Sequence, residues 1–96
     1  MEKSNIDIQR IKKAAKKIKA IASSKRVEII SMLEDGPMNV TEIHRKLQVD
    51  QPVASIHLNE LKCNGYLISR RDGKKTFYSL NDEVLEGILN CVEDFF

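Results

Sequence analysis

The sequence predicts a mainly α, α+β fold in a single domain, built from five helices and one two-stranded β-hairpin. Three observations lead to this prediction. Ninety-six residues suffice for one modest core and leave no room for a separate module. Apolar residues recur at helical spacing in five segments, each bounded by capping or breaking residues. An Asp-Gly pair at Asp72-Gly73 lies between two strand-like runs and signals a hairpin.

The composition excludes several classes of protein. No apolar run approaches a membrane span, and the first ten residues lack the apolar core of a signal peptide. Two cysteines form neither a disulfide framework nor a zinc-finger spacing, so we expect a cytoplasmic protein with reduced thiols. No Ser/His/Asp set, phosphate loop or carboxylate pair suggests an enzyme. Charge is uneven: residues 1–26 hold nine Lys or Arg, whereas residues 82–96 hold acidic residues and no basic one.

The first predicted helix runs from about Asn5 to Ile21. Its apolar residues recur at alternating steps of three and four, with lysines around them: Ile8, Ile11, Ala15, Ile18 and Ala22. So long a helix has little to pack on in so small a domain. We therefore expect its apolar stripe either to fold back on the body or to meet a partner.

The second predicted helix covers about residues 25–34. Ser23 or Ser24 supplies its N-cap, and Asp35-Gly36-Pro37 ends it. Its inward residues are predicted to be Val27, Ile29, Ile30 and Leu33.

A short extended segment, residues 38–40, precedes the third predicted helix. Asn39 with Glu42 three residues on resembles a capping box, which opens a helix ending at Leu47. The residues predicted to face inward are Val40, Ile43 and Leu47.

The fourth predicted helix occupies residues 50–65, only two residues after the third. Asp50 is expected to cap it with its carboxylate, Pro52 suits its first turn, and Gly65 suits a left-handed C-terminal cap. Its apolar face is narrow: Ala54, Leu58 and Leu61. The opposite face carries short uncharged side chains rather than Lys and Glu, which suits the edges of base pairs.

Strand-like runs at residues 66–69 and 75–80 flank a cationic turn containing Arg70, Arg71, Lys74 and Lys75. Asn81 then caps a last helix from Asp82 to about Asp94. The apolar residues of this helix are Leu85, Ile88, Leu89, Val92 and Phe95, with Phe96 after them.

Two short helices joined by a tight turn form a helix-turn-helix (40–64), and a basic hairpin after them (66–80) is a wing. The sequence thus predicts a winged helix-turn-helix that binds double-stranded DNA. The predicted DNA-binding residues on the fourth helix are Gln51, Pro52, Val53, Ser55, Ile56 and Asn59, of which Gln51 and Ser55 are expected to read bases. The predicted phosphate-binding residues on the wing are Arg70, Arg71, Lys74 and Lys75.

The chain resembles the ArsR-type bacterial transcriptional regulators over about residues 18–81. The resemblance lies in the order and spacing of ASSKRVEII at 22–30, VTEI at 40–43, QPVASIHL at 51–58 and GYL at 65–67. It continues through RRDGK at 70–74 and FYSL at 77–80. The resemblance implies a homodimeric repressor of a near-palindromic operator, with residues 1–22 and 82–96 as dimerisation helices. The implied dimer interface comprises Ile8, Ile11, Ala15, Ile18, Leu85, Ile88, Leu89, Val92 and Phe95.

The departures from that family limit what carries over. Members that sense metals use a Cys-x-Cys-type pair at the start of the third helix, or Asp, His and Glu on the last helix. Here residues 38–41 read MNVT and the last helix has no His, so we expect no metal and no cofactor. Ile56 stands where a basic residue is common, and a methyl contact to thymine replaces that contact. The pattern identifies no effector.

Other readings of individual residues stay open. The fold by itself is compatible with a protein–protein interaction module, although such a module does not need four cations on the wing. Cys63 and Cys91 are compatible with a thiol-redox-responsive repressor, although inert thiols are commoner. His57 is more often a hydrogen-bonded structural residue than a ligand, and His44 is expected at the surface.

Overall fold

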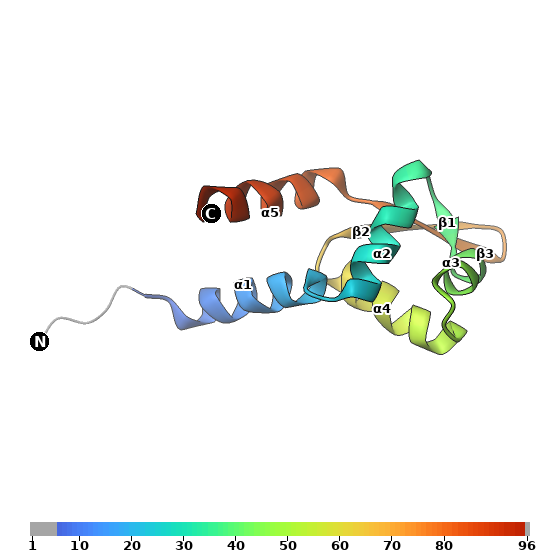
Figure 1. Cartoon of the computed structure of the whole chain (residues 1–96), viewed down its shortest axis with the longest axis horizontal. Helices are drawn as coiled ribbons and strands as arrows, with labels where there is room; N and C mark the ends of the chain where they lie inside the picture. The colour runs from blue at the N-terminus through green and yellow to red at the C-terminus, as the bar shows by residue number, and fades with distance from the viewer. Residues whose placement is uncertain (1–5, 96) are drawn as a thin grey trace, which may run out of the picture.

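A computed structural model describes residues 6–95, and for Phe95 the backbone only. Five α-helices, one short 3-10 turn and three strands follow one another in this part of the chain (Figure 1). The helices are α1 (Ile8–Ile21), α2 (Ser24–Met32), α3 (Val40–Leu47), α4 (Gln51–Cys63) and α5 (Asp82–Phe95). The 3-10 turn is η1 (Leu33–Asp35), and the strands are β1 (Met38–Asn39), β2 (Leu67–Asp72) and β3 (Lys75–Leu80).

The predicted five-helix, α+β architecture is confirmed, with shifts at element ends. The second helix ends at Met32 and continues to Asp35 as the 3-10 turn. The predicted start of the first helix at Asn5 lies outside the described residues, as do Phe96 and the side chain of Phe95.

The hairpin belongs to a three-stranded antiparallel sheet with the order β1-β3-β2. Within the wing, Leu67 pairs with Leu80 and Asp72 pairs with Lys75, so Gly73 and Lys74 form the turn. Gly73 adopts a positive φ of 64°, which glycine tolerates without steric cost. The prediction of two strands was incomplete, because Met38 pairs with Tyr78 and adds a short third strand. This pairing anchors the wing to the start of α3.

The helices begin and end with the predicted capping residues, with one correction. Asn39 and Glu42 form the predicted capping box, with N···O distances of 2.9 and 3.1 Å. Asp50 occupies the N-cap position of α4, but its side chain accepts no capping hydrogen bond, so that expectation was wrong. Gly65 ends α4 at φ 84°, and the backbone N–H groups of Gly65 and Tyr66 bond Lys62 and Leu61. This arrangement is a Schellman motif.

The core lies where α2, α3 and α4 meet the base of the wing. Its most buried large side chains are Ile29, Ile43, Leu58, Leu61 and Tyr66. Burial of these four aliphatic side chains and of the Tyr66 ring is the main favourable contribution to folding. The prediction that Val27 faces inward was wrong, since this side chain is 51% exposed, on a different face of α2 from Ile29.

Tyr66 fixes the direction in which α1 leaves the core. Its hydroxyl donates to the carbonyl oxygen of Lys17 at 2.6 Å, and Lys17 Nζ lies 5.8 Å from the ring centroid. Burial raises the pKa of Tyr66, which keeps the hydroxyl protonated as a donor. The C-terminal end of α1 is thereby attached to the core, where Ala20 is its one buried residue.

Beyond this attachment, α1 and α5 extend from the body as two separate arms (Figure 1). Of the two alternatives for the α1 stripe, folding back on the body is wrong, because Ile8, Ile11 and Ile18 are each at least half exposed. On α5, Leu85 and Ile88 pack against the core, whereas Leu89 and Val92 are exposed. None of the described helices has the length and apolarity to cross a bilayer.

Candidate nucleic-acid interface

The turn between α3 and α4 is rigidly hydrogen-bonded. Gln48 adopts the left-handed conformation (φ 60°, ψ 44°), and its N–H donates to the carbonyl of Arg45. The N–H of Val49 donates to the carbonyl of His44, and the His44 ring lies 3.2 Å from the carbonyl of Val49. Because the chain reverses within three residues, the angle between the two helices is set locally. The predicted helix-turn-helix is confirmed.

The fourth helix has one buried and one exposed face. Ala54, Leu58 and Leu61 are fully buried. The six predicted DNA-binding residues of this helix are all exposed, namely Gln51, Pro52, Val53, Ser55, Ile56 and Asn59. No side chain among these six carries a charge, and Ile56 is 62% exposed. Uncharged amide, hydroxyl and methyl groups match the donors, acceptors and thymine methyl of the major groove.

The wing carries the predicted cations, but they divide into two groups. Lys74 and Lys75 line a hollow of about 320 Å³ that reaches to Gln51 and Ser55 on α4. Arg70 and Arg71 instead line a separate hollow of about 430 Å³ with Pro37. Of the four wing cations, Lys74 and Lys75 therefore share a surface depression with Gln51 and Ser55, whereas Arg70 and Arg71 line another.

Arg71 is partly tied to the wing itself. Its Nε donates to the carbonyl oxygen of Gly73 at 3.1 Å, while the side chain stays exposed. This bond uses one of the five guanidinium donors and leaves the terminal nitrogens for an external acceptor. A side chain held in this way loses less conformational entropy when it binds a phosphate.

Sequence reasoning did not assign five residues of the hollow between wing and helix to the site: Asn39, Val40, Thr41, Thr76 and Tyr78. Thr41 lies in the first turn of α3, where free backbone N–H groups favour anions. Its place inside the capping box, between Asn39 and Glu42, was a local signal for this position. Thr76 and Tyr78 alternate along β3, and only strand pairing brings them beside α4.

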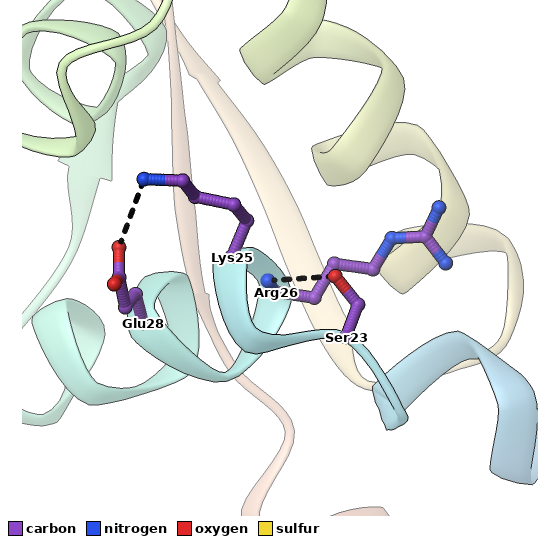
Figure 2. A network of polar contacts seen from close by, with 4 residues as sticks. All are labelled: Ser23, Lys25, Arg26 and Glu28. Atoms are coloured by element: carbon purple, nitrogen blue, oxygen red, sulfur yellow. Dashed lines mark hydrogen bonds and ion pairs between the residues drawn. The ribbon is translucent and has the colours of Figure 1, made fainter.

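His57 is a hydrogen-bonded residue, as predicted. Its Nδ1 accepts from Nε of Arg26 at 3.1 Å, across 31 positions of sequence. Burial of the ring lowers the pKa of His57, and the positive charges of Arg26 and Lys25 lower it further. Figure 2 shows the first turn of α2, where Lys25 reaches Glu28 at 3.7 Å while the Arg26 guanidinium extends the other way.

An apolar groove of about 410 Å³ lies between α2 and α5, and Leu80 at the end of β3 also lines it. Its apolar lining is Ile21, Val27, Ile30, Leu80, Leu85, Ile88 and Leu89. Acidic side chains stand at the same groove, namely Glu34, Asp82 and Glu86. This groove accounts for the exposure of Val27, whose side chain lines it rather than the core.

Cys63 and Cys91 are free and exposed, and Cys63 Sγ lies 3.6 Å from Asn59 Oδ1. Within residues 6–95 no group of three or more His, Cys, Asp or Glu side chains is arranged to hold a metal ion.

Comparisons with known proteins also identify transcriptional regulators as relatives of this chain. Residues 23–69 match the model of "Bacterial regulatory protein, arsR family". An arsenical resistance operon repressor of Staphylococcus aureus is 32% identical over 75% of this chain and 69% of its own. An uncharacterised HTH-type transcriptional regulator of Methanocaldococcus jannaschii is 34% identical over 91% of this chain and 99% of its own. The repressor SdpR of Bacillus subtilis is also 34% identical, over 80% of this chain and 86% of its own.

Solved structures agree with the sequence relatives. A homodimeric winged helix-turn-helix DNA-binding domain from Mycobacterium bovis superposes with a TM-score of 0.78 at 25% identity. It covers 98% of this chain and 90% of its own. NolR from Sinorhizobium fredii superposes with a TM-score of 0.80 at 25% identity, over 100% of this chain and 96% of its own. The helix-turn-helix, the wing and these likenesses lead to one conclusion: the chain belongs to the arsR family of bacterial transcriptional regulators.

Proposed function

We propose that this regulator is a homodimeric repressor that binds a near-palindromic operator in double-stranded DNA through α4 and the wing. One observation carries the proposal. The exposed, uncharged face of α4 shares a hollow with Lys74 and Lys75. The uncharged face of α4 suits contact with base edges, and the two lysines suit contact with phosphates. Binding to chromosomal DNA places the protein in the cytoplasm.

Within this interface the residues have different roles. Gln51, Ser55 and Asn59 read base edges by hydrogen bonding, because amides suit adenine and a hydroxyl suits either donor or acceptor. Val53 and Ile56 offer methyl groups to thymine. Pro52 holds the first turn of α4, and Thr41 adds a phosphate contact at the first turn of α3. All of these residues belong to the helix-turn-helix, residues 40–64, and the wing, residues 66–80, lies next to it.

The wing anchors the phosphate backbone through Arg70, Arg71, Lys74 and Lys75, all of them exposed. Such contacts fix the register of α4 on the duplex and carry no sequence information themselves. Their combined contribution falls with salt, since each neutralised phosphate releases condensed counterions.

Residues 1–22 and 82–96 supply the dimer surface. Exposed Ile8, Ile11 and Ile18 on α1 and exposed Leu89 and Val92 on α5 leave the arms without cover in a single chain. Large contiguous apolar patches of this kind usually mark interfaces. The lysines of α1 complement the acidic residues of the α2–α5 groove, and the M. bovis relative in structure is described as homodimeric. Phe95 belongs to the same proposed surface by its place in the sequence.

The salt dependence of DNA binding tests the wing. Arg71→Ala with Lys74→Ala is expected to weaken binding to all duplexes by similar factors. The slope of log Kd against log salt should fall by roughly one for each phosphate that the wing no longer neutralises. The measurement is fluorescence anisotropy with an operator selected from randomised duplexes and with an unrelated duplex.

The matched control is Lys12→Ala with Lys13→Ala, which removes the same charge from exposed positions of α1. This pair should leave the slope near that of the unmodified chain. The dimer should persist in this control, because exposed charge pairs on the arms contribute only about 0–1 kcal/mol each. A slope unaffected by the wing substitutions would exclude the wing from the interface. Selection of no duplex at all would favour a protein–protein interaction module instead.

A further inference from the structure

Arg26 links three helices at the point where they meet. Its Nε donates to Nδ1 of His57 on α4 at 3.1 Å, and a terminal nitrogen donates to the carbonyl of Ala20 on α1 at 3.3 Å. The backbone N–H of Arg26 donates to Oγ of Ser23, which caps α2 (Figure 2). One side chain therefore connects the apolar arm α1 and the first turn of α2 to the base-reading helix α4.

The bond to Nδ1 constrains the protonation state of His57. A guanidinium is always protonated and only donates, so Nδ1 must present its lone pair. His57 is therefore neutral, with its proton on Nε2. A protonated imidazole has no acceptor, and it would place a second positive charge against Arg26. The link exists only while His57 stays neutral.

No negative charge in the described part of the chain offsets such a second cation. The charged groups that shift the pKa of His57 are Arg26 and Lys25, both on α2, and Glu28 on the same helix pairs with Lys25. From α1 the contact is a carbonyl, that of Ala20. Helix α3 and strand β2 also pack on α4, but no charged group from either lowers or raises the pKa of His57. Between residues 6 and 95, no carboxylate forms an ion pair with His57. This includes Glu60, which lies one turn further along α4.

We propose that His57 is a positioning residue for operator binding: its neutral ring fixes α4 to α1 and α2 through Arg26, and its protonation releases this link and weakens the DNA complex. The inference rests on the proposed function, since it concerns the same helix. The direction of the pH effect on DNA affinity distinguishes this role from a simple gain of charge. Added positive charge ordinarily strengthens attraction to DNA phosphates, whereas protonation of His57 has the opposite effect.

The first test measures operator affinity of the full chain at pH 7.5 and pH 5.5 and at constant ionic strength. The unmodified protein should bind about two- to tenfold more weakly at the lower pH, as expected for the loss of one hydrogen bond. His57→Asn keeps an acceptor near the position of Nδ1 and does not titrate, so this pH dependence should disappear. At pH 7.5 this variant should also bind more tightly than His57→Ala, which has no acceptor.

The matched control is His44→Asn, because His44 is the other histidine and lies on α3. It should retain the pH dependence of the unmodified chain. Affinity that is unchanged or higher at a pH below the NMR titration midpoint of His57 overturns the proposal. Loss of affinity at pH 5.5 that persists in His57→Asn overturns it as well, since another group then titrates.

The second test needs no DNA and separates this proposal from the proposed function. Nitrogen NMR of the imidazole rings in the free chain should show His57 as the Nε2–H tautomer at pH 7.5. Its titration midpoint should lie below the ordinary value of about 6.5 and rise in Arg26→Gln. An Nδ1–H tautomer, or a midpoint indifferent to Arg26→Gln, refutes the link. A protein that shows the link yet binds no duplex at either pH refutes the proposed function and the role of His57 in it.

Discussion

At the scale of single residues, Gln51 has the position that a base-reading side chain needs. It lies in the first turn of α4, is exposed, and lines the hollow that Lys74 and Lys75 complete. In helix-turn-helix proteins the N-terminal residues of the recognition helix contact base edges. The lysines beside it can hold a phosphate while the amide reads the adjacent base.

Gln51→Ala is therefore expected to cost about 1–3 kcal/mol on the best operator and to relax one base position there. Affinity for the selected operator and for single-base variants of it gives the measurement. Gln9→Ala, which removes the same amide from an exposed site on α1, should change neither quantity. Equal loss on specific and unrelated duplexes would identify Gln51 as a backbone contact.

At the scale of elements, two helix N-termini in the same motif are capped differently. Asn39 is 7% exposed, its side chain accepts from the N–H of Glu42, and its own backbone N–H donates to the Glu42 carboxylate, which completes the capping box. Asp50 holds the corresponding position before α4 without a side-chain bond. The helix α3 therefore depends on its cap, whereas Pro52 and the buried face of α4 define the start of that helix.

Asn39→Ala is expected to lower the free energy of unfolding by about 1–2 kcal/mol, because free N–H groups at the start of α3 lose their acceptor. Asp50→Ala should cost only a few tenths of a kcal/mol, since it removes no capping bond. Urea unfolding followed by circular dichroism compares the two variants directly. Equal losses would show that Asp50 caps α4 in solution.

At the scale of the whole molecule, the arms α1 and α5 keep apolar side chains exposed in a single chain. Their exposed apolar residues lie outside the core that α2, α3 and α4 complete. In a twofold dimer they would cover one another, and two copies of α4 would face successive major grooves about 34 Å apart. Opposite charges on the arms add little, about 0–1 kcal/mol for each exposed pair.

Ile11→Glu combined with Leu89→Glu is expected to give folded monomers that have lost specific operator binding, because burial of a carboxylate in an apolar interface is unfavourable. Sedimentation equilibrium and operator affinity, measured on the same samples, should change together. Ser31→Glu is the control: this residue is exposed on α2, outside the arms, the helix-turn-helix and the wing. A compact monomer of the unmodified chain at micromolar concentration would contradict the dimer.

The sequence by itself determined the elements and their order, because their signals are local. Helical spacing of Ala54, Leu58 and Leu61 predicted the buried face of α4, and these residues are fully buried. The pairing of Asn39 with Glu42 and the glycine at residue 65 predicted caps that the structure contains. The exposed, uncharged face of α4 followed from the same periodicity.

Only the tertiary structure decided which residues from distant segments meet. It paired Met38 with Tyr78, joined Lys74 and Lys75 to Gln51, and placed Arg26 against His57. It also corrected Val27, whose apolar character was compatible with either the core or the α2–α5 groove. Local spacing specifies the face of a helix on which a residue lies, but contacts across tens of residues depend on how the helices pack.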